Sequence, residues 1–174
     1  MKIGLCGTMS VGKTTLINYL HQDFHFAHFH KATERSKYLN DLGIPLNTDS
    51  TLKGQLVFLA ERSSELLRSR LLTDRTIWDV CAFTNLAKSM SDKEKNDFEK
   101  VAMNLKDEYD LVIYVKPDGV KIEDNGVRET NSNYRDDIDD EIRRLLELYP
   151  PQNLLVISGS TEERASTILS HIYR

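Results

Sequence analysis

Near its start, the chain carries a glycine-rich segment with the spacing of a loop that cradles phosphate groups. Residues 7–15 read Gly-x-x-x-x-Gly-Lys-Thr-Thr, after an apolar run at 3–6 and before an apolar-periodic segment at 16–20. The glycines let successive N–H groups turn inward, and the following helix adds its positive end. Lys13 then reaches the β- and γ-phosphates, and Thr14 places its hydroxyl on Mg²⁺. The pattern predicts a nucleotide-binding P-loop made of Gly7, Thr8, Met9, Ser10, Val11, Gly12, Lys13, Thr14 and Thr15.

Asp74 and Arg75 follow the third expected strand and form a second group of reactive side chains. Because this strand is expected to end beside the P-loop, Asp74 can hold Mg²⁺ through water. Arg75 can bind a phosphate or the hydroxyls of a phosphoryl acceptor, since a guanidinium matches pairs of oxygen atoms. A capping aspartate beside a surface arginine is the alternative interpretation. We expect Thr14 and Asp74 to be the metal-binding residues.

Glu34 and Arg35 follow the second expected strand. Phosphoryl transfer to a hydroxyl is helped by a carboxylate that accepts the hydroxyl proton, and Glu34 is the candidate for that role. Arg35 is a candidate for binding the acceptor. If the acceptor is already a phosphate, no base is needed and Glu34 only orients it. A solvated charge pair at a helix start is the structural alternative.

A polar, glycine-containing stretch, about residues 117–136, is predicted as a lid. Its arginines, Arg128 and Arg135, can close over the phosphates and neutralise the charge that develops on the transferred group. Gln55 and Trp78 are candidates for reading a base, because glutamine can pair with a base edge and tryptophan can stack on one. The structural alternatives are a place on a helix surface for Gln55 and a packing role for Trp78.

The elements that must position these residues alternate between strand and helix along the chain. Their arrangement predicts an α/β, three-layer P-loop NTPase fold, in which a five-stranded parallel sheet is flanked by helices. Ligands bind such sheets at the carboxyl ends of the strands, where every candidate above is expected. We expect strands at 2–6, 24–30, 70–73, 111–115 and 154–158, and helices at about 13–21, 36–42, 51–68, 79–88, 91–106, 136–148 and 161–173.

Composition limits the classes of protein that fit. The 174 residues, 40% of them hydrophobic and 29% charged, are expected to form one domain over residues 1–174. No apolar run approaches the ~20 residues of a membrane span, and no signal peptide fits before the first strand. Two cysteines in apolar contexts indicate a reducing cytoplasm, and the net charge of −4 argues against a large nucleic-acid-binding face. A small site for one nucleotide remains compatible with that charge.

The chain resembles the AAA_28-type P-loop ATPase/kinase family, which includes the ribosylnicotinamide-kinase domain of bacterial NadR proteins. The resemblance runs in order through nearly the whole chain, and its specific part is the P-loop. One departure is Asn125, which stands where the family has a second aspartate. The matching segments are 7–15, Glu34-Arg35 with 42–47, Gln55, 73–79, 124–128, Ser158-Gly159-Ser160 and Glu163-Arg164.

The resemblance, with the wider similarity to thymidylate and deoxynucleoside kinases, implies a cytoplasmic enzyme of nucleotide metabolism that uses ATP and Mg²⁺. It would transfer the γ-phosphoryl group to a small acceptor, a nucleoside or nucleoside monophosphate. The acceptor would lie between Glu34, Arg35, Gln55, Arg75 and Trp78. The residues predicted to take part in catalysis are Lys13, Glu34, Asp74, Arg75, Arg128 and Arg135.

Other functions stay open at this point. One is a regulatory P-loop ATPase or nucleotide-binding switch without a small-molecule acceptor. Another is a kinase that acts on a modified base in DNA and holds only one flipped base. A GTPase is disfavoured, because Lys116-Pro117-Asp118 lacks the asparagine of the guanine-binding segment. A homodimer is also open, since thymidylate-kinase-like folds often dimerise.

Overall fold

The structure is a computed structural model that describes residues 1–33, 35–118 and 132–173. Its centre is a sheet of five parallel strands in the order β2-β3-β1-β4-β5. This confirms the predicted α/β fold with a five-stranded parallel sheet. The strands are β1 (Lys2–Cys6), β2 (His30–Ala32), β3 (Leu71–Thr73), β4 (Leu111–Val115) and β5 (Leu154–Ile157).

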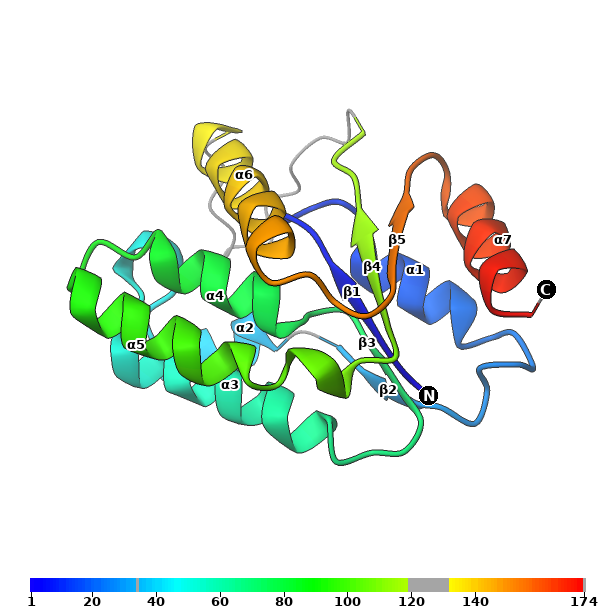
Figure 1. Ribbon diagram of the computed structural model, residues 1–174, viewed down its shortest axis with the longest axis horizontal. Coiled ribbons are helices and arrows are strands. Elements are labelled where there is room, and N and C mark those ends of the chain that lie inside the picture. Colours follow the sequence, from blue (N-terminus) through cyan, green and yellow to red (C-terminus); the bar gives the residue numbers. More distant parts are fainter. Residues whose placement is uncertain (34, 119–131, 174) are drawn as a thin grey trace.

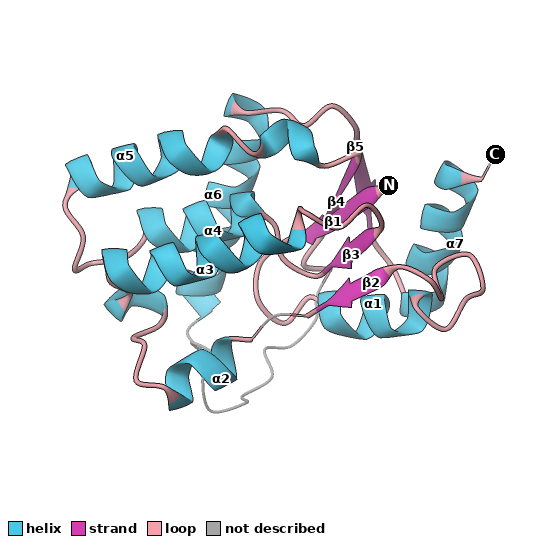
Figure 2. Cartoon of the chain, turned by 90° about the horizontal axis from the view of Figure 1, so that it is seen from below, coloured by secondary structure: helices cyan, strands magenta, loops and turns pink. Residues whose placement is uncertain are grey.

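Helices cover both faces of the sheet and give the three predicted layers (Figure 1). Helices α1 and α7 pack on one face with β1 residues such as Ile3 and Leu5, and α3 to α6 pack on the other with Cys6. Figure 2 shows the same division from below. The helices are α1 (Lys13–Leu20), α2 (Ser36–Asp41), α3 (Leu52–Glu65), α4 (Ile77–Asn85), α5 (Asp92–Met103), α6 (Ser132–Leu148) and α7 (Thr161–Ile172), with 3-10 turns η1 (Asn47–Asp49) and η2 (Lys106–Glu108).

The position of β1 in the sheet determines what surrounds the P-loop. Gly4 of β1 pairs with Thr73 of β3 on one side and with Val112 of β4 on the other. The strands are parallel, so the segments that follow β3 and β4 flank the segment that follows β1. All five residues of β4 are buried, as its continuous apolar run predicts.

The expected strand at 24–30 is wrong, because most of this segment forms turns and β2 begins only at His30. The amide of Phe26 donates to the Asp23 carbonyl, and the amide of Phe29 donates to the Phe26 carbonyl. Phe26 and Phe29 are both buried, and their rings meet edge to face at 5.3 Å. Alternation of aromatic and histidine residues therefore reflects a packed turn and not the two-residue period of a strand.

Two helix boundaries also differ from expectation where it matters for the site. Helix α6 begins at Ser132 and not at 136, so Arg135 belongs to its first turns and not to a lid. Helix α4 begins at Ile77 and not at 79, because Thr76 caps it and Asp79 completes the capping box. None of the helices in the described ranges is long and apolar enough to span a bilayer.

Candidate active site

The P-loop backbone adopts conformations that two of its glycines make possible. Gly7 has φ +147° and Gly12 has φ +86°, values that side chains disfavour. A Cβ added to Gly7 would also come within 2.7 Å of the Val115 carbonyl oxygen of β4. The loop therefore lies directly against the end of β4 and then enters α1 at Lys13.

Lys13 lies inside the loop and not in solvent. Its Nζ donates to the carbonyl oxygens of Gly7 at 2.5 Å and Thr8 at 2.7 Å, and the residue is only 7% exposed. Burial lowers the pKa of Lys13, Arg75 acts in the same direction, and the carboxylates of Asp79 and Asp74 oppose the shift. The ammonium group is thus held against the backbone of the loop, and a bound phosphate chain would need such a positive charge.

The structure brings Asp74 from the end of β3 to the start of α1. The Thr14 hydroxyl donates to Asp74 Oδ2 at 2.5 Å, and Asp74 is 1% exposed while Thr14 is exposed. A hydroxyl and a carboxylate side by side are oxygen donors of the kind that Mg²⁺ prefers. The donor set therefore fits the metal that the sequence predicts.

Asp79, which sequence reasoning missed, ties the P-loop to α4. Its Oδ1 accepts from the Gly7 amide at 3.1 Å, and its Oδ2 accepts from the amide and hydroxyl of Thr76 at 2.8 and 2.7 Å. The residue has no exposed surface. The available sequence signal was the Thr-x-x-Asp spacing, which resembles a capping box and predicts a helix start without a contact to the P-loop.

We expect Asp79→Asn to lower the free energy of unfolding by about 2–3 kcal/mol. The amide keeps one acceptor oxygen but turns an NH₂ donor toward groups that themselves donate, at a site with no exposed surface. Urea unfolding of the variant beside wild type measures the loss. Asp97→Asn is the control, because the ion pair of Asp97 with a described residue is an exposed i,i+4 pair with Lys93. A variant as stable as wild type would contradict a structural role for these bonds.

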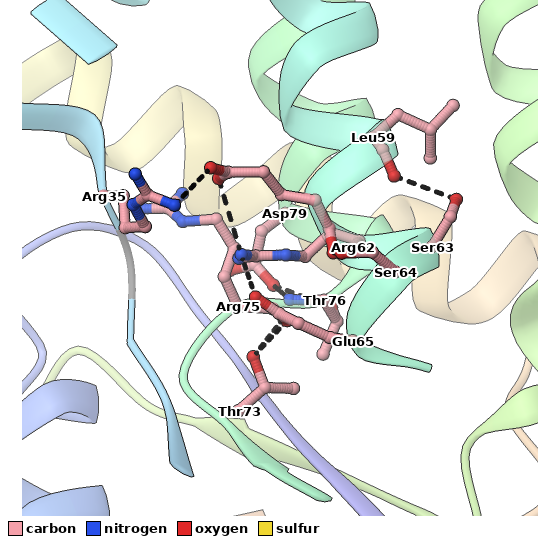
Figure 3. A network of polar contacts seen from close by, with 11 residues as sticks. Arg35, Leu59, Arg62, Ser63, Ser64, Glu65, Thr73, Arg75, Thr76 and Asp79 are labelled. Atoms are coloured by element: carbon pink, nitrogen blue, oxygen red, sulfur yellow. Dashed lines mark hydrogen bonds and ion pairs between the residues drawn. The ribbon is translucent and has the colours of Figure 1, made fainter. Parts of the chain in front are cut away.

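Beyond Asp74, arginines and carboxylates alternate between the start of α2 and the end of β3 (Figure 3). Arg35 lies 3.4 Å from Glu61, and the buried Arg62 lies 2.5 Å from Glu65 and 3.8 Å from Glu61. Glu65 in turn accepts from the Thr73 hydroxyl at 3.1 Å, and burial raises the pKa of Glu65. Glu61, Arg62 and Glu65 were not singled out from the sequence, because charged residues on an amphipathic helix usually face solvent.

Arg75 lies near this network (Figure 3), and Gln55 lies on the same helix, α3, as Arg62 and Glu65. The Arg75 guanidinium stands 4.9 Å from the centre of the Phe83 ring, so a cation–π contact fixes its direction. The Arg75 carbonyl accepts from the Thr73 hydroxyl at 3.2 Å. Gln55 is 3% exposed on α3, so it does not belong to the helix surface.

The expectation that Trp78 reads a base is corrected by its packing. Trp78 has no exposed surface, its ring lies 5.6 Å from that of Tyr109, and its indole N–H donates to the Tyr149 carbonyl at 3.0 Å. The indole ring therefore belongs to the core between the sheet and α3 to α6. The first turn of α4 therefore places Trp78 in the core and not where a base could stack on it.

For Trp78→Phe we expect a loss of about 1–2 kcal/mol in the free energy of unfolding, because the Tyr149 carbonyl loses its donor and some packing goes with it. The KM for the phosphoryl acceptor that the sequence predicts should stay within about two-fold of wild type. Thermal unfolding and steady-state kinetics measure the two quantities. An increased acceptor KM in a variant of unchanged stability would restore the base-reading role.

The remaining predicted residues divide into two groups. Arg135, 9% exposed on α6, approaches the P-loop through its backbone, since its carbonyl accepts from the Thr8 hydroxyl at 2.8 Å. Its place in a helix corrects the expectation of a lid arginine. Glu34 and Arg128, the predicted base and the other lid arginine, lie outside the described residues.

Solved structures with the same fold include nucleotide-bound proteins. A deoxyadenosine kinase from M. mycoides with dCMP and dCDP bound matches with 16% identity and a TM-score of 0.68, over 99% of this chain and 98% of that one. YorR from Bacillus subtilis, in complex with phosphorylated GDP, matches with 14% identity and a TM-score of 0.61, over 100% and 99%. NadR in complex with NR matches with 14% identity and a TM-score of 0.76, over 98% of this chain and 50% of NadR.

At sequence identities this low, the similarity to these solved structures shows a shared fold and nothing more specific. No curated protein matches the sequence. A family comparison is more specific, because the sequence pattern of an AAA domain matches residues 2–164 and so includes the P-loop, Asp74, Asp79 and Arg164. The chain therefore belongs to the AAA_28 family of AAA domains.

Proposed function

We propose that the protein is a Mg²⁺- and ATP-dependent kinase that phosphorylates a nucleoside or a nucleoside monophosphate. The observation that carries the proposal is the contact between Thr14 and Asp74 beside the buried Lys13. It joins a phosphate-binding loop to oxygen donors for a metal at one edge of the sheet. The same edge carries Arg75 and the network around Arg35, which gives a second, polar side to the site.

In this proposal each described residue has one task. The P-loop amides and Lys13 bind the β- and γ-phosphates, and Thr14 and Asp74 hold Mg²⁺, Asp74 through water. The metal would neutralise charge on the phosphate oxygens. Arg75 binds the acceptor or the transferred group, since its guanidinium matches two oxygens at once. Gln55 and Arg35 contact the acceptor from α3 and from the start of α2.

Glu34 and Arg128 complete the proposal from outside the described residues. Glu34 accepts the proton of the acceptor hydroxyl, or orients the acceptor if that is already a phosphate. Arg128 neutralises charge on the transferred group. The fold shared with deoxyadenosine kinase and with NadR in complex with NR supports a small nucleoside-type acceptor. We place the enzyme in the cytoplasm.

A thermal-shift screen tests the proposal. The protein is held with a non-hydrolysable ATP analogue and Mg²⁺, and single nucleosides and monophosphates are added, because a ligand that binds the folded state raises the unfolding temperature by mass action. The acceptor should raise it further than the analogue alone, and transfer of labelled γ-phosphate from ATP to that compound should follow. ATP hydrolysis with no acceptor would favour a regulatory ATPase. Transfer only to an oligonucleotide would favour a kinase of a base in DNA.

A further inference from the structure

Arg164 of α7 is a buried cation at the P-loop to which neither the sequence motif nor the proposed chemistry gives a task. It is 4% exposed, although arginine is seldom buried without strong partners. Its Nη1 donates to the Val11 carbonyl at 2.6 Å, in the middle of the P-loop. Within the described residues, its buried Nε has no hydrogen-bond partner. The guanidinium therefore binds the P-loop even though burying its charge costs desolvation free energy.

The Val11 contact determines how one peptide group of the loop is turned. A trans peptide is planar, so its C=O and N–H point in opposite directions. The Val11 carbonyl points to Arg164, and the Gly12 amide in the same peptide must point away from α7. Gly12 is the residue in the left-handed conformation that leads into α1, and Arg164 Nη1 lies 3.5 Å from the position of a Cβ there.

Arg164 also joins the P-loop to the segments after β4 and β5. Its Nη2 lies 3.4 Å from the Lys116 carbonyl and 3.7 Å from Asp118 Oδ2. The same Asp118 oxygen accepts from the Gly159 amide at 3.0 Å, in the turn before α7. One guanidinium thus fixes the relative position of three loops at the carboxyl edge of the sheet.

We propose that Arg164 is a positioning residue for the phosphate donor: by holding the Val11 carbonyl outward, it keeps the Gly12 amide turned toward the bound phosphates. The inference rests on the proposed function, because it takes the P-loop as the donor site. Arg164 itself touches no phosphate. A lysine in its place keeps the charge but loses the planar fork that reaches two carbonyls, so the loop should lose its fixed orientation.

The test compares MgATP and inorganic tripolyphosphate as probes, by equilibrium titration of wild type, Arg164→Lys and Arg164→Met. We expect Arg164→Lys to weaken the binding of both probes by about ten-fold, the size of one lost charged hydrogen bond, and Arg164→Met at least as much. Arg144→Lys is the control, since Arg144 likewise pairs with two carboxylates, Glu99 and Glu141, but has no part in the proposed site. It should keep its affinity for both probes.

The outcomes separate the inference from the proposed function. Wild-type protein that binds neither probe overturns the proposed function, and the inference with it. Wild-type binding with unchanged affinity in folded Arg164→Lys overturns the inference alone. The inference is also overturned if Arg164→Lys loses affinity for MgATP but not for tripolyphosphate, because Arg164 would then act on the nucleoside part of ATP. Equal affinity losses in Arg144→Lys and Arg164→Lys would show only a general effect of replacing a paired arginine, and would also overturn the inference. Should Arg164→Met fail to fold, Arg164→Lys still decides.

Discussion

Replacing Lys13 with alanine is expected to reduce phosphoryl transfer by about a thousand-fold or more, because the largest contribution to such catalysis is charge stabilisation by fixed groups. Lys13 is the cation that the loop holds through the Gly7 and Thr8 carbonyls. Transfer of labelled γ-phosphate to the acceptor found in the thermal-shift screen measures the change.

The fold of Lys13→Ala should survive. Burial lowers the pKa of Lys13 below its ordinary value of 10.5, so the unfolded chain binds this proton more strongly than the folded protein does. The contribution of Lys13 to wild-type stability therefore rises as the pH increases toward 10.5, and at neutral pH its charged form opposes folding. Alanine removes the free-energy cost of burying the charged amine, and this gain offsets the loss of the two hydrogen bonds to the Gly7 and Thr8 carbonyls.

Lys93→Ala provides the control for Lys13→Ala. Lys93 is exposed on α5 and pairs with Asp97 there, so its loss should change neither activity nor stability measurably. Retained transfer by folded Lys13→Ala would rule out the P-loop as the donor site. Loss of transfer in both variants would point to an effect of net charge on the assay.

The fold was predictable where hydrophobic periodicity and length agreed. The run at 111–115 is a buried central strand because it is apolar on both faces, and Ser91 with Glu94 begins α5 with the expected capping box. The strand predicted at 24–30 is wrong because Phe26 and Phe29 pack against each other across a turn. The alternating pattern of the sequence fits such a turn as well as it fits a strand. Local sequence pattern therefore predicts most helices and strands, and the segment where it fails is one whose structure depends on tertiary packing.

The residues of the candidate site that come directly after the end of a strand could be predicted from the sequence. Parallel pairing of β1 and β3 places Asp74 beside the P-loop, and the sequence contains both strands. Asp79 and Arg164 could not be found in this way. Each acts by contacting backbone atoms of the P-loop from another element, and no spacing rule relates a helix residue to a carbonyl or amide far away in the chain.

Asp74→Asn should lower activity by about 10- to 100-fold at a fixed Mg²⁺ concentration, and part of the loss should be recovered as Mg²⁺ is raised. The asparagine keeps an oxygen that can accept from the Thr14 hydroxyl, so the contact between β3 and α1 can persist. What it loses is the negative charge, which is what attracts a hard cation and its bound water. Initial rates over a range of Mg²⁺ concentrations separate a weaker metal site from a damaged fold.

Asp110→Asn is the matched control for Asp74→Asn, because Asp110 precedes β4 at the opposite end of the sheet and its side chain is 60% exposed. It should leave the Mg²⁺ dependence of the rate unchanged. If folded Asp74→Asn requires no more Mg²⁺ than wild type, Asp74 serves to hold Thr14 and the start of α1, and the metal is bound without it. If its loss of rate is recovered at high Mg²⁺, the short contact with Thr14 marks the place where the protein holds the metal, and the same edge of the sheet then carries donor, metal and acceptor together.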